Sequence, residues 1–215
     1  MDVQTNNEVE TVVLPNGETV VFYPSSHSYF VRDKKVPSIT ELIQSIYGNS
    51  YANVNPELLQ RSAEYGTKVH KQIQDLIDMR LIGLDISDLL IDKSQETRNY
   101  FTYIEPIYKV NPLFTEKIVV LYDDNNEPVA AGRFDLACEV GENRQKAICD
   151  FKTTSAIHTQ SVSAQLNLYK KAAEQSGYFT KGEITYLGAI HISGEQCKLK
   201  PIQIFGEGFF KKFIK

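Results

Sequence analysis

The stretch from residue 130 to residue 169 constrains the fold of this chain more than any other part of its sequence. It contains two strand-like runs joined by a turn, with Asp135 in the first run and Asp150-Phe151-Lys152 at the end of the second. Because side chains alternate along a strand, we expect Asp150 and Lys152 to share one face and Phe151 to lie on the other. The stretch therefore predicts an acidic and a basic side chain side by side on one strand face.

A helical segment follows the second run, and Gln165 and Tyr169 lie four residues apart in it, on one helix face. Two carboxylates, a lysine and a polar helix face are the groups that a divalent-metal phosphodiesterase needs. Carboxylates hold Mg²⁺ or Mn²⁺, which prefer oxygen ligands, and the metal polarises the phosphate and lowers the pKa of a bound water. A lysine two residues from a metal-binding aspartate stabilises the hydroxide or a phosphate oxygen.

The residues around this stretch resemble the PD-(D/E)xK nuclease superfamily, and within it the RecB-like exonucleases of the phage and mitochondrial genome maintenance types. The resemblance covers roughly residues 20–200 and rests on motifs that occur in the order of the family. The motifs are Gly66-Thr67-Lys68-Val69-His70, Glu116, Gly132-Arg133-Phe134-Asp135, Asp150-Phe151-Lys152-Thr153-Thr154 and Gln165-Leu166-Asn167-Leu168-Tyr169.

The resemblance implies an α/β fold with a restriction-endonuclease-like core. We expect a central mixed sheet of about five strands flanked by helices, preceded by an N-terminal β-ribbon and a helical region. We expect a single nuclease domain over residues 1–215, because the chain has 215 residues and a core of ordinary composition. Its parts are a tail and β-ribbon at 1–36, a helical region at 37–112 and the catalytic sheet core at 113–215.

The resemblance also implies a role for each motif residue. The metal ligands would be His70, Asp135, Asp150, the backbone carbonyl of Phe151 and Glu116, and the ion would be Mg²⁺ or Mn²⁺. Lys152 would position or activate the attacking water, while Gln165 and Tyr169 would help to place the phosphate and the lysine. Thr153, Thr154 and Arg133 would contact the nucleic acid.

Each of these patterns also has a plain structural interpretation. An isolated Asp-x-Lys is most often part of a solvated strand face, and Glu116 alone could be a surface residue at a strand edge. Helix periodicity by itself favours a half-buried structural role for His70, whereas the resemblance favours a metal ligand. We interpret His27, in the strand-like run His27–Val31, as a structural or surface residue, with a DNA contact as the alternative.

The function implied by the resemblance is a metal-dependent exonuclease that hydrolyses phosphodiester bonds at linear DNA ends, in phage or bacterial recombination or repair. DNA with single-stranded or double-stranded ends would be its substrate, and a single-strand annealing or recombination protein its partner. One alternative is an endonuclease or end-processing nuclease of the same superfamily. The other is a catalytically silent DNA-binding or inhibitor module on the same fold.

Composition limits the remaining classes. The net charge of −4 does not indicate a nucleic-acid-binding protein, yet basic residues gathered on one face would suffice for contact with phosphates. Three cysteines without a Cys-x-x-Cys cannot supply a four-cysteine iron–sulfur cluster, and they favour a reducing compartment. The polar N-terminus and the short apolar runs predict no signal peptide and no membrane span, so we expect a cytoplasmic location in a bacterial or phage-infected cell.

Local signals predict the helices and strands. Ser38-Ile39-Thr40-Glu41 is a capping box that starts a helix to about Tyr47, and Asn55-Pro56 starts a longer helix with Val69, Ile73, Leu76 and Ile77 on its apolar face. Residues 92–105 suit a further helix that Pro106 should end or kink. Strands are expected at 11–14, 19–22, 27–31, 115–122, 129–140, 146–153, 183–193 and 199–205. The last helix should run from a cap at Ser161 or Ser163 to about Gly177.

Overall fold

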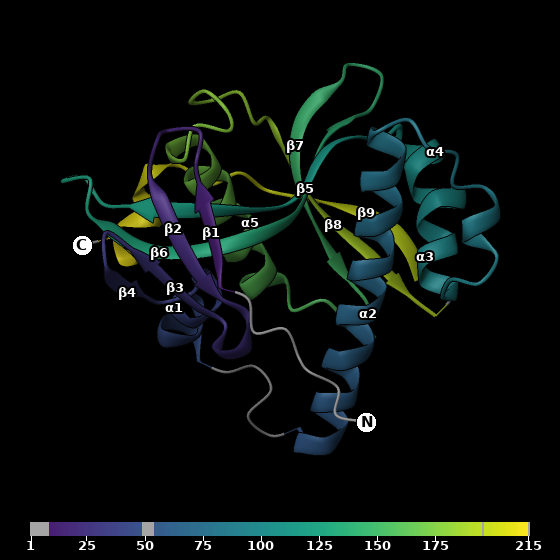
Figure 1. The fold of residues 1–215 in the computed structure, drawn as a ribbon, viewed down its shortest axis with the longest axis horizontal. Helices are drawn as coiled ribbons and strands as arrows, with labels where there is room; N and C mark the ends of the chain where they lie inside the picture. Colours follow the sequence, from purple (N-terminus) through teal and green to yellow (C-terminus); the bar gives the residue numbers. More distant parts are fainter. Residues whose placement is uncertain (1–8, 49–53, 195, 215) are drawn as a thin grey trace.

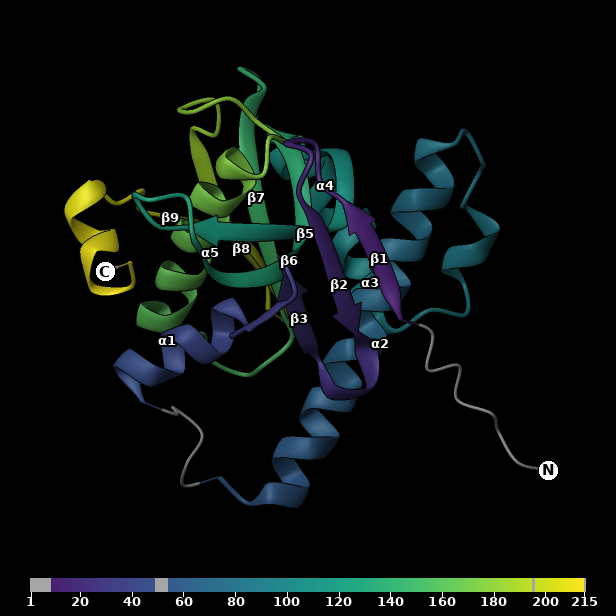
Figure 2. The ribbon, with the colours of Figure 1, turned by 60° about the vertical axis from the view of Figure 1, so that its left-hand side comes forward.

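A computed structural model describes residues 9–48, 54–194 and 196–214, and its elements form an α/β fold (Figures 1 and 2). The chain begins with a small antiparallel sheet in the order β1-β2-β3-β4. Its strands are β1 (Glu10–Val13), β2 (Thr19–Tyr23), β3 (Ser28–Val31) and β4 (Lys34–Val36). The predicted N-terminal β-ribbon is therefore present. A fourth strand, which was not predicted from the sequence, contains Lys34 and Lys35.

The central sheet has five strands in sequence order: β5 (Asn111–Tyr122), β6 (Pro128–Val140), β7 (Gln145–Lys152), β8 (Tyr186–Ser193) and β9 (Gln196–Ile202). Only the β7–β8 pair is parallel among these neighbours, and α5 (Thr159–Gln175) makes the crossover between the two strands. A parallel pair needs such a connection because a hairpin turn cannot reverse the chain twice. The predicted mixed sheet of about five strands is confirmed.

Helices cover both faces of this sheet (Figures 1 and 2). On one face α1 (Ile39–Tyr47) and α5 pack against the sheet and form one apolar core. On the other face a second core is built by α2 (Pro56–Leu81) with a helical run made of α3 (Gln95–Asn99), η3 (Tyr100–Ile104) and α4 (Glu105–Tyr108). Short 3₁₀ turns complete the chain: η1 (Pro24–Ser26), η2 (Asp88–Leu90) and η4 (Glu207–Lys212).

The predicted helix starts are confirmed by their caps. The amide of Glu41 donates to Ser38 Oγ at 3.1 Å, and the Glu41 carboxylate accepts from the Ser38 amide at 2.7 Å. Asn55 Oδ1 accepts from the Glu57 amide at 2.9 Å. The predicted apolar face of α2 is buried throughout, which places this helix on the sheet through Val69, Ile73, Leu76 and Ile77.

Two helix boundaries differ from expectation. The helical run continues through Pro106 to Tyr108, because the preceding turn widens to a π-helix over residues 100–104 and leaves room for the proline ring. The helix α5 starts at Thr159, ahead of Ser161, because the amide of Val162 already donates to the His158 carbonyl at 3.0 Å. Neither expected serine caps it.

Three further expectations concern segment limits. The strand β5 starts at Asn111, so the sheet core begins two residues before the expected boundary at 113. Residues 1–8 of the expected tail and β-ribbon, and Glu195 between the last two expected strands, lie outside the described residues. No helix within residues 9–48, 54–194 and 196–214 is long and apolar enough to cross a membrane.

The N-terminal sheet covers one end of the β5–β6 hairpin. Apolar side chains of β2, β3 and β4 pack against Ile118, Val120 and Ala131, and this packing forms a third core. The amide of Ala131 donates to the carbonyl of Pro37 at 3.0 Å, which joins the segment after β4 to β6. This packing brings β3, near the start of the chain, beside the acidic residues of β5 and β6.

Candidate active site

The strands β6 and β7 separate at the two predicted aspartates. The last pair of their ladder is Leu136 with Cys149, so the next residues outward are Asp135 and Asp150, at opposed positions on one face of the two strands. Beyond this point the amide of Phe151 has no β6 carbonyl to bond, and it donates to Asp135 Oδ2 at 2.7 Å. The end of the ladder therefore places both carboxylates at the opening between the strands.

The predicted alternation along β7 is confirmed. Nζ of Lys152 lies 2.5 Å from Oδ2 of Asp150, and the same nitrogen donates to Gln165 Oε1 at 3.3 Å. Phe151 points to the opposite face, where its ring meets the ring of Tyr100 edge-on at 5.3 Å. Lys152 is thus held between an acid on its own strand and an amide of α5.

The Gly-Thr-x-x-His segment brings α2 to the same place. Nδ1 of His70 lies 3.4 Å from Oδ2 of Asp135, so the histidine contacts one of the two acids. A Cβ atom on Gly66 would lie 3.0 Å from Thr153 Oγ1, which is tighter than ordinary packing. Glycine at this position therefore lets α2 approach the segment that follows β7. This close approach places His70, one turn further along α2, beside Asp135.

Glu116 joins the acids from β5. It lies between Thr115 and Lys117, which pair with Leu136 and Phe134, and this register sets it opposite Asp135. Its φ of +49° is in the left-handed region, which a non-glycine residue in a strand rarely adopts. Backbone strain of this kind costs of order 1–3 kcal/mol and is concentrated at functional sites.

The electrostatics of the three carboxyl groups are linked. Burial, followed by repulsion from Asp135, raises the pKa of Glu116 to about 8. Burial also raises the pKa of Asp135 to about 6, with Asp150 adding to the increase and His70 opposing it. The positive groups around these two carboxyl groups therefore do not offset the combined cost of burial and mutual repulsion.

The acids suit a divalent cation in the chemistry of their oxygens. Carboxylates are ligands for Mg²⁺ and Mn²⁺, and a cation would relieve the repulsion that contributes to these raised pKa values. No group of three or more His, Cys, Asp or Glu side chains in the described part of the chain is spaced as a ligand set, and the Lys152 ammonium lies against Asp150. The predicted role of the Phe151 carbonyl stays a prediction.

Gln165 and Tyr169 share the predicted helix face but meet different groups. Gln165 contacts Lys152, whereas the Tyr169 ring packs beside Gly132 and is 5% exposed. A Cβ atom on Gly132 would lie 2.9 Å from Cε1 of Tyr169, so glycine in the Gly-x-x-Asp motif makes room for that ring. The two motifs are therefore complementary in shape as well as adjacent.

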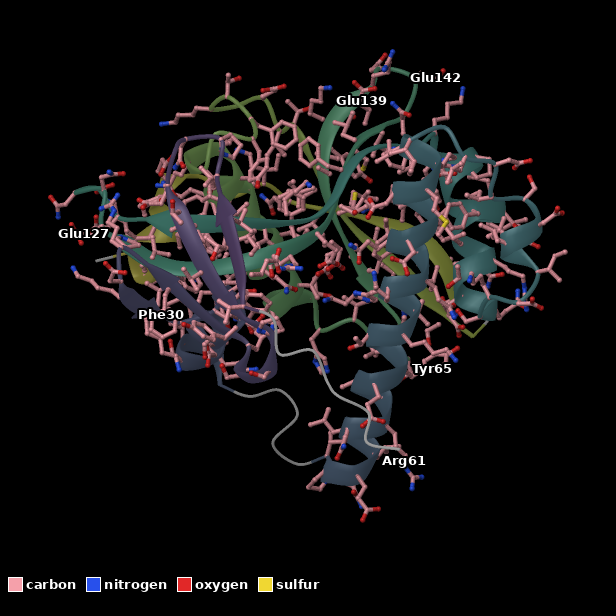
Figure 3. The ribbon with its side chains drawn as sticks, in the orientation of Figure 1. Phe30, Arg61, Tyr65, Glu127, Glu139 and Glu142 are labelled. Atoms are coloured by element: carbon pink, nitrogen blue, oxygen red, sulfur yellow. The ribbon has the colours of Figure 1, made fainter. Side chains whose placement is uncertain are left out.

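Two adjoining hollows open at these residues. The smaller, about 380 Å³, is lined by Glu116, Arg133, Asp135 and Tyr169 among others. The larger, about 940 Å³, is lined among others by Lys152, Thr153, Thr154 and Gln165. Thr40, Thr67 and His70 line both, so the histidine stands at the boundary between them. The larger hollow extends along the first half of α2, the part that carries Arg61 and Tyr65 in Figure 3.

The residues predicted to contact nucleic acid are divided between the hollows. Arg133 lies in the smaller one, with Nη2 2.5 Å from Glu10 Oε2 and its guanidinium carbon 5.0 Å from the centre of the Phe22 ring. Thr153 and Thr154 lie in the larger one, and the Thr154 hydroxyl donates to the Ala156 carbonyl at 2.8 Å. Contact of any of them with a nucleic acid stays a prediction.

Sequence reasoning missed several residues at this site. Tyr29 and Lys71 line the smaller hollow, as does His27, which was interpreted as structural. His191, buried on β8, has Nε2 2.7 Å from the Thr154 carbonyl and so holds the segment after Lys152. No local pattern distinguishes these residues, because each reaches the site through packing between segments far apart in the chain.

Comparisons with known proteins add little to this geometry. No family model and no curated protein matches the chain. Among solved structures, the crystal structure of SSO0001 is similar with a TM-score of 0.42 and 11% sequence identity. That similarity covers 86% of this chain and 75% of the other.

Proposed function

We propose that this chain is a metal-dependent nuclease with a PD-(D/E)xK core that degrades DNA from linear ends. One observation carries the proposal. At the point where β6 and β7 part, Asp135 and Asp150 lie on one face, with Lys152 beside Asp150 and His70 beside Asp135. Opposed acids with a lysine two residues along the strand are the groups that phosphodiester hydrolysis requires.

The resemblance gives each side chain a role that suits its chemistry. Asp135, Asp150, Glu116 and His70 would hold Mg²⁺ or Mn²⁺, which supplies a water of lowered pKa and polarises the phosphate. Lys152 offers its ammonium to the water or to a phosphate oxygen, and Gln165 orients that ammonium through its amide oxygen. Thr153 and Thr154 lie in the larger hollow beside Lys152, where they can contact the backbone of a bound strand.

The proposal extends to a biological class by resemblance alone. Bacterial or phage recombination and repair require degradation of DNA ends, and a single-strand annealing protein would take up the strand that remains. An endonuclease of the same superfamily would use the same residues, so the substrate separates the two. A silent module would bind DNA with its carboxylates held as they are here, against Lys152 and His70.

The deciding experiment uses end-labelled linear DNA and a covalently closed circle of the same sequence. Each is incubated with Mg²⁺, with Mn²⁺ or with EDTA, and a labelled single-stranded RNA is run in parallel. The proteins are wild type, Asp150→Ala and Asp124→Ala, the last of which removes an exposed carboxylate from the turn between β5 and β6.

We expect metal-dependent loss of linear DNA with wild type and with Asp124→Ala, and none with Asp150→Ala. Cutting of the circle would establish the endonuclease alternative, and cutting of RNA would broaden the substrate. Binding of DNA without cutting in any metal would favour the silent module. Cleavage that survives Asp150→Ala would overturn the site assignment.

A further inference from the structure

The chain leaves the central sheet directly after Lys152, where β7 ends, and residues 153–158 lead from there to the start of α5. This β7–α5 connection lines the larger hollow along its whole length. Because the connection follows Lys152 without a break, a shift of the connection would also move the end of the strand that carries the lysine. Whatever holds the connection in place therefore bears on the proposed active site.

His191 lies beside the point where the connection begins. It pairs with Lys152 in the last step of the parallel β7–β8 ladder, so the two side chains share one face of the sheet. The histidine is 3% exposed, and its Nε2 lies 2.7 Å from the carbonyl oxygen of Thr154. A carbonyl oxygen only accepts hydrogen bonds, so Nε2 carries the proton and donates it. The ring therefore ties the chain to β8 two residues beyond the end of the ladder.

The other ring nitrogen of His191 gives no reason for a histidine at this position. Nδ1 is buried without a hydrogen-bond partner among the described residues. When Nε2 carries the proton of a neutral ring, Nδ1 is an acceptor, and a buried acceptor without a partner lowers stability. A leucine in the same space would avoid that cost. The bond from Nε2 to Thr154 is therefore the feature of this side chain that offsets the cost of burying it.

The connection passes this restraint on to α2. A Cβ atom on Gly66 would lie 3.0 Å from Thr153 Oγ1, so the helix and the connection touch with no space between them. His70, which contacts one of the proposed catalytic acids, lies one helical turn after Gly66. A continuous line of contacts therefore runs from His191, through the connection, to the helix that carries His70.

We infer that His191 is a positioning residue of the proposed active site. Its bond to the connection sets where Lys152 and His70 stand relative to the acids. The inference rests on the proposed nuclease function, since these two side chains carry chemistry only under that function. His191 lines neither hollow, so it acts through other residues and does not touch a bound strand. A displacement of about 1 Å at reacting groups can lower a rate about 100-fold, so a tether outside the site is enough to control turnover.

Substitutions of His191 separate the hydrogen bond from the packing. His191→Gln places an amide N–H close to the position of Nε2 and can keep the bond to Thr154. His191→Asn carries its amide near the position of Nδ1 and is too short to reach that carbonyl, and His191→Leu fills the space without a donor. Ser176→Ala is the matched control, because Ser176 is also fully buried and hydrogen-bonded, at the other end of α5.

The first measurements need neither metal nor cleavage. In EDTA, the ¹⁵N chemical shifts of the His191 ring give its tautomer, and hydrogen exchange followed by mass spectrometry reports the opening of residues 153–158. We expect the Nε2–H tautomer in wild type. Exchange of this segment should be faster in His191→Asn and His191→Leu than in wild type or His191→Gln, and Ser176→Ala should leave it unchanged.

Cleavage of end-labelled linear DNA in the presence of metal then gives the effect on turnover. We expect His191→Asn and His191→Leu to lower kcat by about 100-fold and to change KM far less, because the restraint acts on the reacting groups. His191→Gln should recover most of kcat. Ser176→Ala should keep the kcat of wild type even where it lowers stability. Circular dichroism confirms that each variant is folded at the assay temperature.

Several outcomes overturn the inference. An Nδ1–H tautomer would mean that Nε2 does not donate to Thr154. A kcat of wild-type size in His191→Leu would show that the bond does not control turnover, and a kcat in His191→Gln as low as in His191→Leu would assign the effect to packing. Absence of cleavage by wild type in every metal would instead refute the proposed function. The tautomer and the exchange of residues 153–158 would then still decide whether His191 holds the connection.

Discussion

Nζ of Lys152 lies 2.5 Å from Oδ2 of Asp150, which is two residues before it in β7 and on the same strand face. The Asp150 side chain is 4% exposed, and this oxygen has no partner of hydrogen-bond geometry among the described residues. The interaction is therefore an ion pair that compensates the charge of a buried carboxylate. Loss of the lysine would leave that buried charge unpaired.

A double-mutant cycle tests this relationship. Lys152→Met should abolish cleavage and lower the free energy of unfolding by about 2–4 kcal/mol, with the protein still folded at 25 °C. Asp150→Asn with Lys152→Met removes both charges and should recover most of that loss, because no unpaired charge remains. Urea unfolding of the two single variants, Lys152→Met and Asp150→Asn, and of the double variant measures the coupling, and additive effects would contradict it. Lys200→Ala, on an exposed position of β9, is the control.

Asp135 should destabilise the metal-free protein at neutral pH. Its pKa is raised from 3.8 to about 6, mainly by burial. A carboxyl group with a raised pKa in the folded state costs stability above its unfolded pKa, and the cost grows until the pH passes the folded value. In EDTA, Asp135→Asn should therefore raise the free energy of unfolding by about 1–3 kcal/mol at pH 7.5.

The stabilisation by Asp135→Asn should depend on pH. At pH 4 or below, where Asp135 is protonated in the folded protein, the substitution should no longer raise the free energy of unfolding. Urea unfolding at pH 7.5, 6 and 4 gives the profile. A gain that is the same at all three values would show that the substitution acts through packing instead of charge.

Glu139 should make the fold sensitive to acid. Hydrogen bonds from Lys146, Arg144 and Asn111 lower its pKa from 4.5 to about 2. The stabilisation is present above the unfolded pKa and is lost as the pH falls toward the folded value. Wild type should therefore lose more stability between pH 5 and pH 2 than Glu139→Gln, as thermal unfolding across that range would measure.

Glu142 provides the comparison for Glu139. It lies on the same β6–β7 hairpin (Figure 3), but its side chain is 79% exposed. Exposed ion pairs contribute little, so Glu142→Gln should keep the acid sensitivity of wild type. Equal acid sensitivity of wild type and Glu139→Gln would contradict the role of the three hydrogen bonds.

Gly132 should tolerate no larger residue. A Cβ atom there would lie 2.9 Å from Cε1 of Tyr169 and 3.3 Å from Cδ1 of Ile39. Gly132→Ala should cost about 1–3 kcal/mol in unfolding free energy and reduce cleavage, because the Tyr169 ring must move. Gly206→Ala is the matched control, since nothing lies within 4 Å of its added Cβ, and it should change stability by less than about 0.5 kcal/mol. Equal stability of the two variants, measured in urea, would contradict the packing argument.

The sequence predicts the local structure well where the signal is local. The Ser38 capping box, the apolar face of α2 and the alternation of Asp150, Phe151 and Lys152 are confirmed. The expected helix end at Glu105 was wrong, because the run continues through Pro106 to Tyr108 after a π-turn whose Tyr100 and Ile104 pack in the core. The start of α5 was also wrong, because a backbone bond to His158 begins the helix without a side-chain cap.

The sequence by itself determined which chemical groups this protein brings together: the acids of β6 and β7, the lysine beside one of them and the histidine of α2. Alternation along a strand and the periodicity of a helix depend only on neighbouring residues. The sequence alone therefore predicts which side chains share a strand face or a helix face. Only the tertiary structure decided where β6 and β7 part and that Tyr29 and Arg133 meet over Phe22. Arg133 lies about a hundred positions after Phe22 and Tyr29, and the packing of one sheet on another, which no local pattern records, brings them together.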